Sequence, residues 1–557
     1  MRPRERDESS DHVALHDNMH AVLARGAGLF WSRRRFTPAA ARAVTVPGLA
    51  CAVAGGCWVR RWGATPSSGA LGSLRGGKLS VVGGVMLVLL FPTFGVVVTS
   101  GRPVRVGAAE PSHAAVTPIQ HVVVIFQENH SFDNVLGGLC VADRLSCSGA
   151  TTGVLHTGVR IPLRVARDIV PTVNHSAASQ SAAINGGVMN GFDRITGCAA
   201  PGYRCYSQYG AREIPNLRKL AESYVISDRT FSENPVPSWG GHLELIAGQL
   251  DGFLGENPVS SVSGVRGPGW GCDSNLDTPW KDPTNPSAAY VLVPSCIPRP
   301  DGLGPYRASP VQYVPTILDQ LSGAGLSWKL YTEKTTSDAG YLWSICPTFA
   351  GCLFDANNGD QPDPNWVDRS NFAADAAAGD LPAYSVILPS YSSSQHNDTS
   401  MLAGDNSIAG LVKAVMTGPP DQWRSTVIFI TYDDCGCFYD HVAPPAGSGL
   451  GIRVPMVIVS PQSKAAFVDH GVASFDSMLA FVEQNWDLGP LTPLDATAYD
   501  YCRSFMFTTL PCTGPAPAAS PRVGRAAPLR IPLQLSPIPA ASLQWVEAHP
   551  GNRNDPT

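Results

Sequence analysis

The chain has 557 residues, of which 44% are hydrophobic and 15% are charged, and its formal net charge is −5. This length allows one large α/β domain with appendages, or two to three ordinary domains. The net negative charge argues against a nucleic-acid partner. Residues 1–78 nevertheless carry twelve Lys and Arg against five Asp and Glu, whereas the remainder carries 28 against 40. A basic segment followed by an acidic one is expected across a membrane boundary.

An uncharged, largely apolar segment at residues 79–101 marks that boundary, directly after Arg75 and Lys78. It is long enough to span a bilayer as a signal anchor. It also fits the apolar part of a secretory signal, with the small residues 106–108 as a cleavage site, and a buried core helix is a third interpretation. The first two interpretations place the rest of the chain outside the cytoplasm, either secreted or anchored to the membrane.

The cysteines agree with an extracytoplasmic location. Twelve of the fourteen follow the apolar segment, and they occur as neighbours in sequence. The six pairs are Cys140/Cys147, Cys198/Cys205, Cys272/Cys296, Cys346/Cys352, Cys435/Cys437 and Cys502/Cys512. Local pairs of this kind predict small disulfide-closed loops in an oxidising compartment. Cys435/Cys437 is the doubtful pair, because a three-residue loop strains a disulfide.

Residues 118–511 have a uniform texture of apolar strand-like runs, helical patterns and loops rich in Gly, Pro and Ser. Strands are predicted at 121–127, 223–227, 326–331, 383–388, 427–431 and 454–459, and helices at 408–415 and 477–484. Residues 256–303 read as a long loop. This alternation predicts an α/β sandwich. The predicted organisation is a basic arm (1–78), the apolar segment (79–101), a linker (102–117), the main domain (118–511) and a Pro/Ala-rich tail (512–557).

Two of the predicted strands end in acidic or amide side chains. Glu128 and Asn129 follow the first strand, and Asp433 and Asp434 follow the strand at 427–431. Runs of β-branched residues predict parallel strands buried on both faces, and ligands bind at the carboxyl ends of such strands. Each pair alone is equally typical of a turn. Together, three carboxylates and an amide at one sheet edge predict a divalent metal ion, with Ca²⁺, Mg²⁺, Mn²⁺, Fe²⁺ and Zn²⁺ as candidates.

Ser238 stands between Pro237 and Trp239, just before a helical pattern that begins at Leu243. The start of a helix favours an anion, and a serine hydroxyl beside a metal is a candidate nucleophile for phosphorus. A helix cap is the alternative role of this serine. His175 and His396 lie in polar loops and are candidates for binding a phosphate oxygen or protonating a leaving group. His441 is the weakest candidate and is expected to anchor its loop.

Taken together, these segments resemble the bacterial and plant phosphoesterase family, which contains non-specific phospholipases C and a group of acid phosphatases. Residues 128–137 resemble its E-N-R-S-F-D-x-x-x-G signature, and residues 237–239 its P-S-W-P-N-R nucleophile segment. Residues 431–442 are similar to T-Y-D-E-H-G-G-F-Y-D-H-V, and residues 395–406 resemble an H-P-P…A-G-E segment. The resemblance covers about residues 118–490 with the segments in the family's order.

The resemblance implies an alkaline-phosphatase-like three-layer α/β/α sandwich with a mostly parallel central sheet and one active-site metal. It implies that Glu128, Asn129, Asp433 and Asp434 are the metal ligands. Ser238 would be the nucleophile and form a phosphoseryl intermediate, and His175 and His396 would contact the phosphoryl group or the leaving oxygen. The implied substrate is a phosphomonoester or a phospholipid, with membrane contact through residues 79–101 if they are not cleaved.

The chain departs from the family pattern in three places. The usual P-N-R reads Gly240-Gly241-His242, the usual second carboxylate Glu is Asp434, and the usual H-G-G is Cys435-Gly436-Cys437. None of these changes removes a predicted ligand or the nucleophile. They leave open a second interpretation, in which the chain is a non-catalytic cell-surface binding protein on a decayed phosphoesterase fold.

Overall fold

An eight-stranded sheet organises the chain in the computed structural model, which describes residues 113–549 apart from 144, 262–263, 265 and 514–524. These residues belong to one unit that runs from Arg102 to Thr557. The predicted arm, the apolar segment 79–101 and most of the linker lie outside the described residues. Within the described ranges, the structure contains no helix of the length and apolar character that a membrane span requires.

The strand order of the main sheet confirms the prediction of a mostly parallel sheet. In spatial order the strands are β11 (Trp366–Asp368), β10 (Trp328–Thr332), β12 (Tyr384–Ile387), β1 (His121–Gln127), β13 (Thr426–Tyr432), β14 (Met456–Val459), β6 (Val225–Ser227) and β15 (Phe467–Asp469). Neighbouring strands run parallel except at β14, which is antiparallel to both β13 and β6. The carboxyl ends of β1, β12 and β13 therefore meet at one edge.

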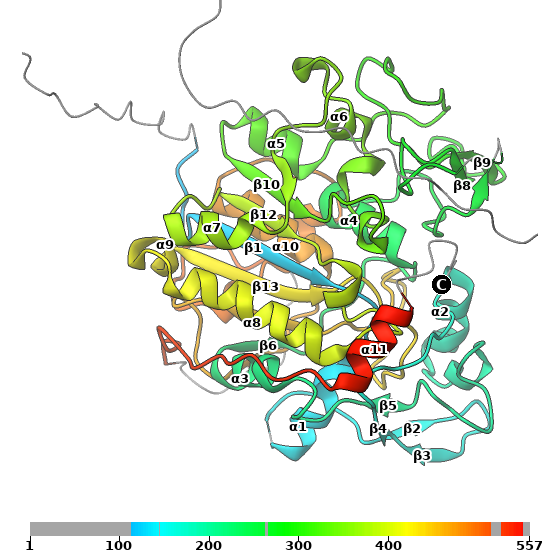
Figure 1. Ribbon diagram of the computed structural model, residues 1–557, viewed down its shortest axis with the longest axis vertical. Helices are drawn as coiled ribbons and strands as arrows, with labels where there is room; N and C mark the ends of the chain where they lie inside the picture. Colours follow the sequence, from blue (N-terminus) through cyan, green and yellow to red (C-terminus); the bar gives the residue numbers. More distant parts are fainter. Residues whose placement is uncertain (1–112, 144, 262–263, 265, 514–524, 550–557) are drawn as a thin grey trace, which may run out of the picture. The chain divides into compact units, whose positions relative to one another are not determined.

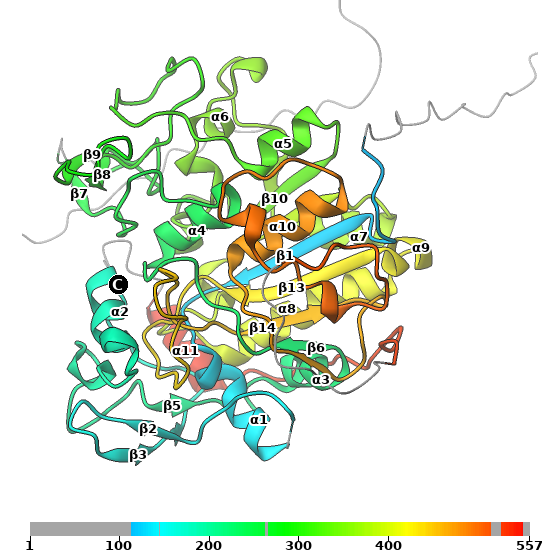
Figure 2. The same ribbon diagram turned by 180° about the vertical axis from the view of Figure 1, so that it is seen from behind.

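Helices cover both faces of this sheet and complete the predicted three-layer α/β/α sandwich. The helices are α1 (Gly138–Ala142), α2 (Ala177–Ile184), α3 (Pro215–Ser223), α4 (Ser238–Ala247), α5 (Ile317–Gly323), α6 (Ala350–Leu353), α7 (Asn371–Ala378), α8 (Met401–Thr417), α9 (Pro420–Arg424), α10 (Phe475–Asn485) and α11 (Ala540–Ala548). Helices α7, α8 and α9 lie in front of the sheet in Figure 1. Helices α4, α5 and α10 lie on the opposite face, which Figure 2 shows from behind.

The core follows from the two apolar runs at the centre of the sheet. All seven residues of β13 and six of the seven in β1 are buried, as expected for strands covered on both faces. Helix α8 turns Ile408, Val412 and Val415 toward this core, and the Ser400 side chain caps its first turn by accepting from the Ala403 N–H. The predicted helical pattern at 408–415 is thereby confirmed.

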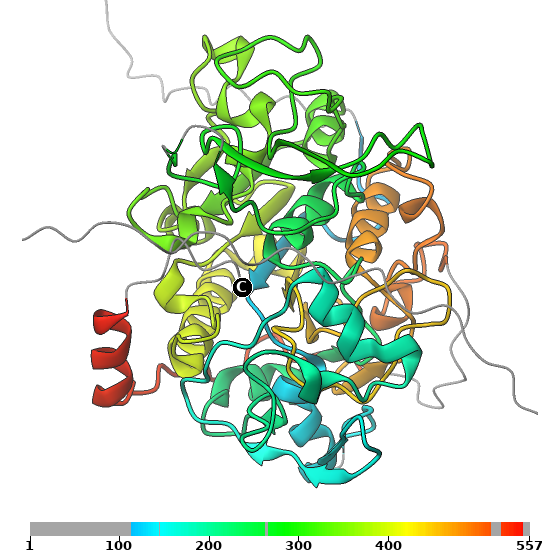
Figure 3. The same ribbon diagram turned by 90° about the vertical axis from the view of Figure 1, so that its right-hand side faces the viewer.

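Two segments differ from their predicted local structure. Residues 256–303 contain a small antiparallel sheet rather than an irregular loop, and Ser223 ends α3 instead of starting a strand. The small sheets consist of β2 (Thr152–Val154) with β3 (Arg160–Pro162), β4 (Arg164–Val165) with β5 (Ser207–Gln208), and β7 (Ser260–Ser261) with β8 (Leu276–Trp280) and β9 (Val291–Pro294). The C-terminal segment bonds to α8 through Asn406 and Ser536, and α11 lies outside the α8 layer (Figure 3).

Five of the six predicted disulfides are present, namely Cys140–Cys147, Cys198–Cys205, Cys272–Cys296, Cys346–Cys352 and Cys502–Cys512. The doubtful pair is not bridged, since Cys435 and Cys437 are free thiols whose Sγ atoms lie 3.4 Å apart. Both are fully buried.

Candidate active site

The register of β1 against β13 brings the two acidic strand ends together. Gln127 lies opposite Tyr432 in the parallel ladder, so Glu128 and Asp433 leave the sheet at the same level. Asn129 has a left-handed backbone with φ of 62°, and its N–H donates to Asp433 Oδ1 at 2.7 Å. The backbone N–H of Asp434 donates to the same oxygen at 2.7 Å. Asp433 Oδ1 thus holds together the two loops that follow β1 and β13.

The acidic side chains at this edge are buried, and four of their oxygen atoms lack hydrogen-bond partners among the described residues. Glu128, Asp433 and Asp434 are fully buried, and both Glu128 oxygens, Asp433 Oδ2 and Asp434 Oδ2 have no hydrogen-bond partner among the described residues. Burial raises the pKa of Glu128 to about 8. Burial, and then the charge of Glu128, raise the pKa of Asp433 to about 7. Burial, and then the charge of Asp433, raise the pKa of Asp434 well above its ordinary value. Clustered, unpaired carboxylates of this kind are costly unless a cation lies between them.

A divalent cation therefore fits the residues present. Oxygen donors from carboxylates suit the hard and borderline divalent ions. Glu128 and Asp433 each offer an oxygen to a group of ligand atoms that lie within 4.8 Å of one another. Asp434 is outside that group. Its Oδ1 accepts from the Gly436 N–H at 2.5 Å, so Oδ2 is the oxygen that could still bind a cation.

Ser238 faces this cluster from the opposite side as the first residue of α4. Pro237 precedes it with extended backbone, and the Ser238 hydroxyl donates to Asn129 Oδ1 at 3.5 Å. The helix approaches the strand end closely, because a Cβ atom on Gly241 would lie 3.0 Å from the Asp433 carbonyl oxygen. The glycine in place of the usual asparagine permits that approach.

The third ligand atom of the group belongs to His242, which the sequence analysis treated only as a departure from the family pattern. His242 Nε2 lies 3.3 Å from Glu128 Oε1. The residue follows Ser238 by four positions in α4, so both side chains lie on the same face of the helix. The sequence pattern started this helix at Leu243, after His242, whereas α4 begins at Ser238, so the shared face of Ser238 and His242 was not predicted.

His175 and His396 lie close together, with ring centroids 6.3 Å apart. The His396 ring stacks on Trp343, with centroids 5.7 Å apart. The loop of His396 bonds to the end of β1, because the Glu128 N–H donates to the Ser394 carbonyl oxygen. The Gln180 side chain donates both to the His175 carbonyl oxygen and to the carbonyl oxygen of Val236, two residues before Ser238. Hydrogen bonds between neighbouring loops thus connect the segments that carry all seven predicted site residues.

A second acidic cluster near the site is structural. Asp133 and Asp440 share the buried Arg453 guanidinium, and the His441 side chain lies 2.5 Å from Asp133. Burial lowers the pKa of His441, but the hydrogen bond to Asp133 and its charge outweigh burial and raise it overall. The arginine supplies the cation that this cluster requires. His441 anchors its loop, as predicted.

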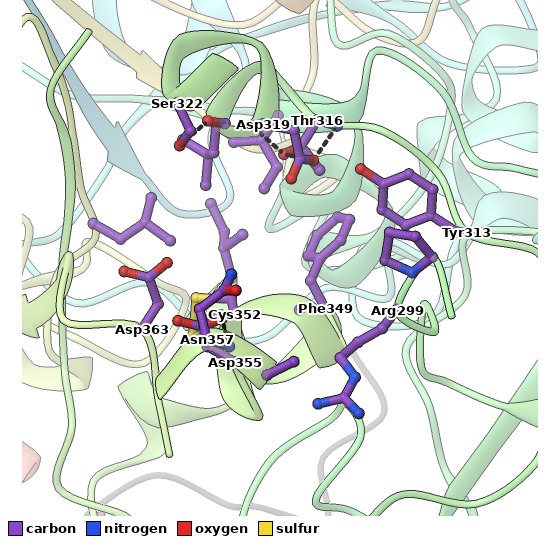
Figure 4. A pocket seen from close by; sticks show the side chains of 18 of the residues that line it. Arg299, Tyr313, Thr316, Asp319, Ser322, Phe349, Cys352, Asp355, Asn357 and Asp363 are labelled. Carbon is purple, nitrogen blue, oxygen red and sulfur yellow. Dashed lines mark hydrogen bonds between the residues drawn. A yellow bond between two sulfur atoms is a disulfide. The ribbon is translucent and has the colours of Figure 1, made fainter. Parts of the chain in front are cut away.

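The cavity drawn in Figure 4 lies away from these residues. It has a volume of about 310 Å³ and is lined by Ile246 near the end of α4 and by polar side chains that include Asp319, Asp355 and Asp363. None of the predicted site residues lines it.

The chain matches known proteins across this domain. The model of the phosphoesterase family matches residues 119–489. Phospholipase C B of Mycobacterium tuberculosis is 24% identical over 467 residues, which cover 72% of this chain and 80% of the relative. A non-hemolytic phospholipase C of Burkholderia pseudomallei is 28% identical over 31% of this chain and 32% of its own length. A Vibrio parahaemolyticus protein of the alkaline phosphatase superfamily aligns with 10% identity over 69% of this chain and 72% of its own, with a TM-score of 0.31.

These findings define the class of protein as a hydrolase that acts on phosphoester bonds. The family match spans more than half of the chain and includes both acidic strand ends and residues 237–239. The chain belongs to the phosphoesterase family.

Proposed function

We propose that the chain is a metal-dependent, phospholipase C-like enzyme that uses Ser238 as its nucleophile. The observation that carries the proposal is the position of the Ser238 hydroxyl, which donates to Asn129 Oδ1 and lies beside the Glu128 and Asp433 carboxyl groups with their unpartnered oxygens. Glu128, Asn129, Asp433 and Asp434 are the proposed ligands of one divalent ion. When bound, this ion supplies a Lewis acid that lowers the cost of the charge on the phosphoryl group.

The reaction follows from the remaining residues. Ser238 Oγ attacks phosphorus and loses its proton to solvent, and the bond from phosphorus to the alcohol oxygen breaks as the seryl ester forms. His175 and His396 hold the phosphoryl oxygens, and one of them protonates the leaving alkoxide. Water then attacks phosphorus, the bond from phosphorus to Ser238 Oγ breaks, and the phosphorylated head group leaves as the serine hydroxyl is restored. Fixed donors and positioning supply most of the catalysis in phosphoryl transfer.

An apolar groove beside the nucleophile segment favours a phospholipid over a small phosphomonoester. The groove has a volume of about 430 Å³ and lies between the start of α2 and residues 234–236. Its walls include Val236, Leu250, Phe253 and Leu254. Gln180 joins the segments that carry His175 and Ser238, so the groove adjoins the proposed reaction centre. An acid phosphatase has no need of such a surface.

The proposed location of the enzyme is outside the cytoplasm. The five disulfides support this proposal, because disulfides persist in oxidising compartments. Its proposed partner is therefore a phospholipid that it meets at an external membrane surface.

The test is hydrolysis of phosphatidylcholine vesicles, of p-nitrophenylphosphorylcholine and of p-nitrophenyl phosphate by the full-length protein. The proposal predicts that Ser238→Ala and a chelator each abolish turnover, and that the choline substrates are preferred over the phosphomonoester. Leu254→Asp, in the groove, is expected to lose more activity on vesicles than on the soluble choline ester. A correctly folded, metal-supplied protein with no turnover would instead support the non-catalytic binding protein.

A further inference from the structure

His242 is held in a single orientation by its own helix. Its Nδ1 lies 2.7 Å from the Ser238 carbonyl oxygen, one helical turn earlier. A carbonyl oxygen only accepts hydrogen bonds, so Nδ1 carries the proton and donates it. The ring is also fixed by an edge contact with Phe126, with centroids 5.0 Å apart. In the neutral ring, Nε2 is therefore a bare lone pair aimed away from the helix.

That lone pair points at another acceptor. His242 Nε2 lies 3.3 Å from Glu128 Oε1, and neither atom has a hydrogen-bond partner among the described residues. The two side chains are 4% and 0% exposed, so water does not screen them. Two buried lone pairs that face each other repel unless a proton or a metal ion lies between them. Asp433 offers a third donor atom within 4.8 Å of both.

The distances suit a shared metal ion. A nitrogen and an oxygen ligand each about 2.1 Å from one ion lie about 3.0 to 3.4 Å apart when they occupy adjacent positions. The observed 3.3 Å falls in that range. Metal-binding histidines usually donate their other ring N–H to a carbonyl or carboxylate, as His242 does to Ser238. Arginine, the usual family residue here, has no lone pair to offer.

We propose that His242 is a nitrogen ligand of the active-site metal, together with Glu128 and Asp433. This inference rests on the metal dependence proposed above and adds a metal preference to it. An imidazole ligand suits metals such as Zn²⁺ or Fe²⁺, whereas an all-oxygen site suits Ca²⁺, Mg²⁺ and Mn²⁺. The histidine also ties the metal to the helix that carries Ser238, so ligand and nucleophile are positioned by the same backbone.

The test uses the full-length protein, His242→Gln and, as a matched control, His441→Gln, whose histidine lies in the neighbouring acidic cluster. The first readout is pulsed EPR of the Mn²⁺-loaded proteins, which detects coupling to a coordinated imidazole nitrogen. The second is Zn²⁺ and Ca²⁺ affinity from competition with a chelator. Circular dichroism confirms that each variant is folded.

The proposal predicts imidazole coupling in the wild type and in His441→Gln, and its loss in His242→Gln. Zn²⁺ affinity is expected to fall at least about tenfold in His242→Gln, as is typical when an interaction at a metal site is removed, while Ca²⁺ affinity changes little. Metal binding without imidazole coupling, or an unchanged preference for Zn²⁺ in His242→Gln, would overturn the proposal and leave the metal requirement intact. Failure of the wild type to bind any metal would overturn both.

Discussion

Arg453 connects the two loops that carry the proposed metal ligands, and its removal is the clearest test of that architecture. The side chain is fully buried. Its Nε lies 3.1 Å from Asp440 Oδ1 and its Nη2 lies 3.2 Å from Asp133 Oδ1. Its Nη1 donates to the carbonyl oxygens of Ser148 and Asp228 at 2.9 and 2.8 Å. Asp133 follows the first ligand pair in the chain, and Asp440 follows the second.

Arg453→Met is expected to lower the free energy of unfolding by at least about 4 kcal/mol. Removing one partner of a buried ion pair costs about 3–5 kcal/mol, and here two carboxylates lose the same cation. Each carbonyl left without a donor adds about 1–3 kcal/mol, partly relieved by relaxation of the methionine site. Urea unfolding with the disulfides intact measures the difference.

The pH dependence of this loss checks its cause. Burial already raises the pKa of Asp440 to about 6, and Arg453 opposes that shift. Without the arginine, the pKa of Asp440 in the folded protein rises further above its unfolded value. The Asp440 carboxyl then stabilises the fold when it is protonated, and this stability is lost as the pH rises. The cost of Arg453→Met is therefore expected to be larger at pH 8 than at pH 5. A loss below about 1 kcal/mol at both pH values would refute the reasoning, because a buried pair cannot be that weak when one partner is removed.

Two further predictions concern groups near the site. The folded pKa of His441 is raised, so its pairing with Asp133 stabilises the protein below the unfolded pKa of 6.5 and is lost as pH rises through the folded pKa. Between pH 6 and pH 9, the free energy of unfolding measured in urea should therefore fall by about 1 kcal/mol more in the wild type than in His441→Gln. Equal decreases in the two proteins would contradict this. Alkylation of the denatured, unreduced protein should label both Cys435 and Cys437 in mass-mapped peptides. Their complete protection would show that they are bridged.

The central sheet was predictable because its strands are continuous apolar runs. The residues of β1 and β13 are β-branched or aromatic at most positions, and burial on both faces requires that pattern. Because β1 and β13 are parallel neighbours, their carboxyl ends lie at the same sheet edge, and this brings Glu128 close to Asp433. What the sequence did not contain was the register, which depends on pairing between strands three hundred residues apart.

The small sheet within residues 256–303 was missed for a local reason. In β8 the side chains of Leu276, Thr278 and Trp280 alternate inward, but Asp277 and Pro279 between them read as turn residues. Proline has no backbone N–H to donate to a strand ladder, so its presence in a sequence argues against a central strand such as β8. Sequence periodicity over five residues cannot separate this case from a loop.

His242 was missed because the helix was predicted to begin at Leu243, whereas α4 begins at Ser238 and includes His242. The family pattern shows only that residue 242 differs from the usual arginine. The chemical role of His242 depends on the direction in which α4 points its side chain. Only the packing of α4 against the end of β1 shows that the changed residue reaches Glu128.

The central claim, that Ser238 carries the phosphoryl group, is tested most directly by trapping the intermediate. The metal-supplied protein is mixed with p-nitrophenylphosphorylcholine, quenched in acid and digested, and the peptides are mapped by mass spectrometry. The account predicts one added phosphorylcholine group on the peptide that contains Ser238, and none in Ser238→Ala. Turnover without a phosphorylcholine-modified Ser238 peptide under rapid quench, or turnover that persists in Ser238→Ala, would contradict it.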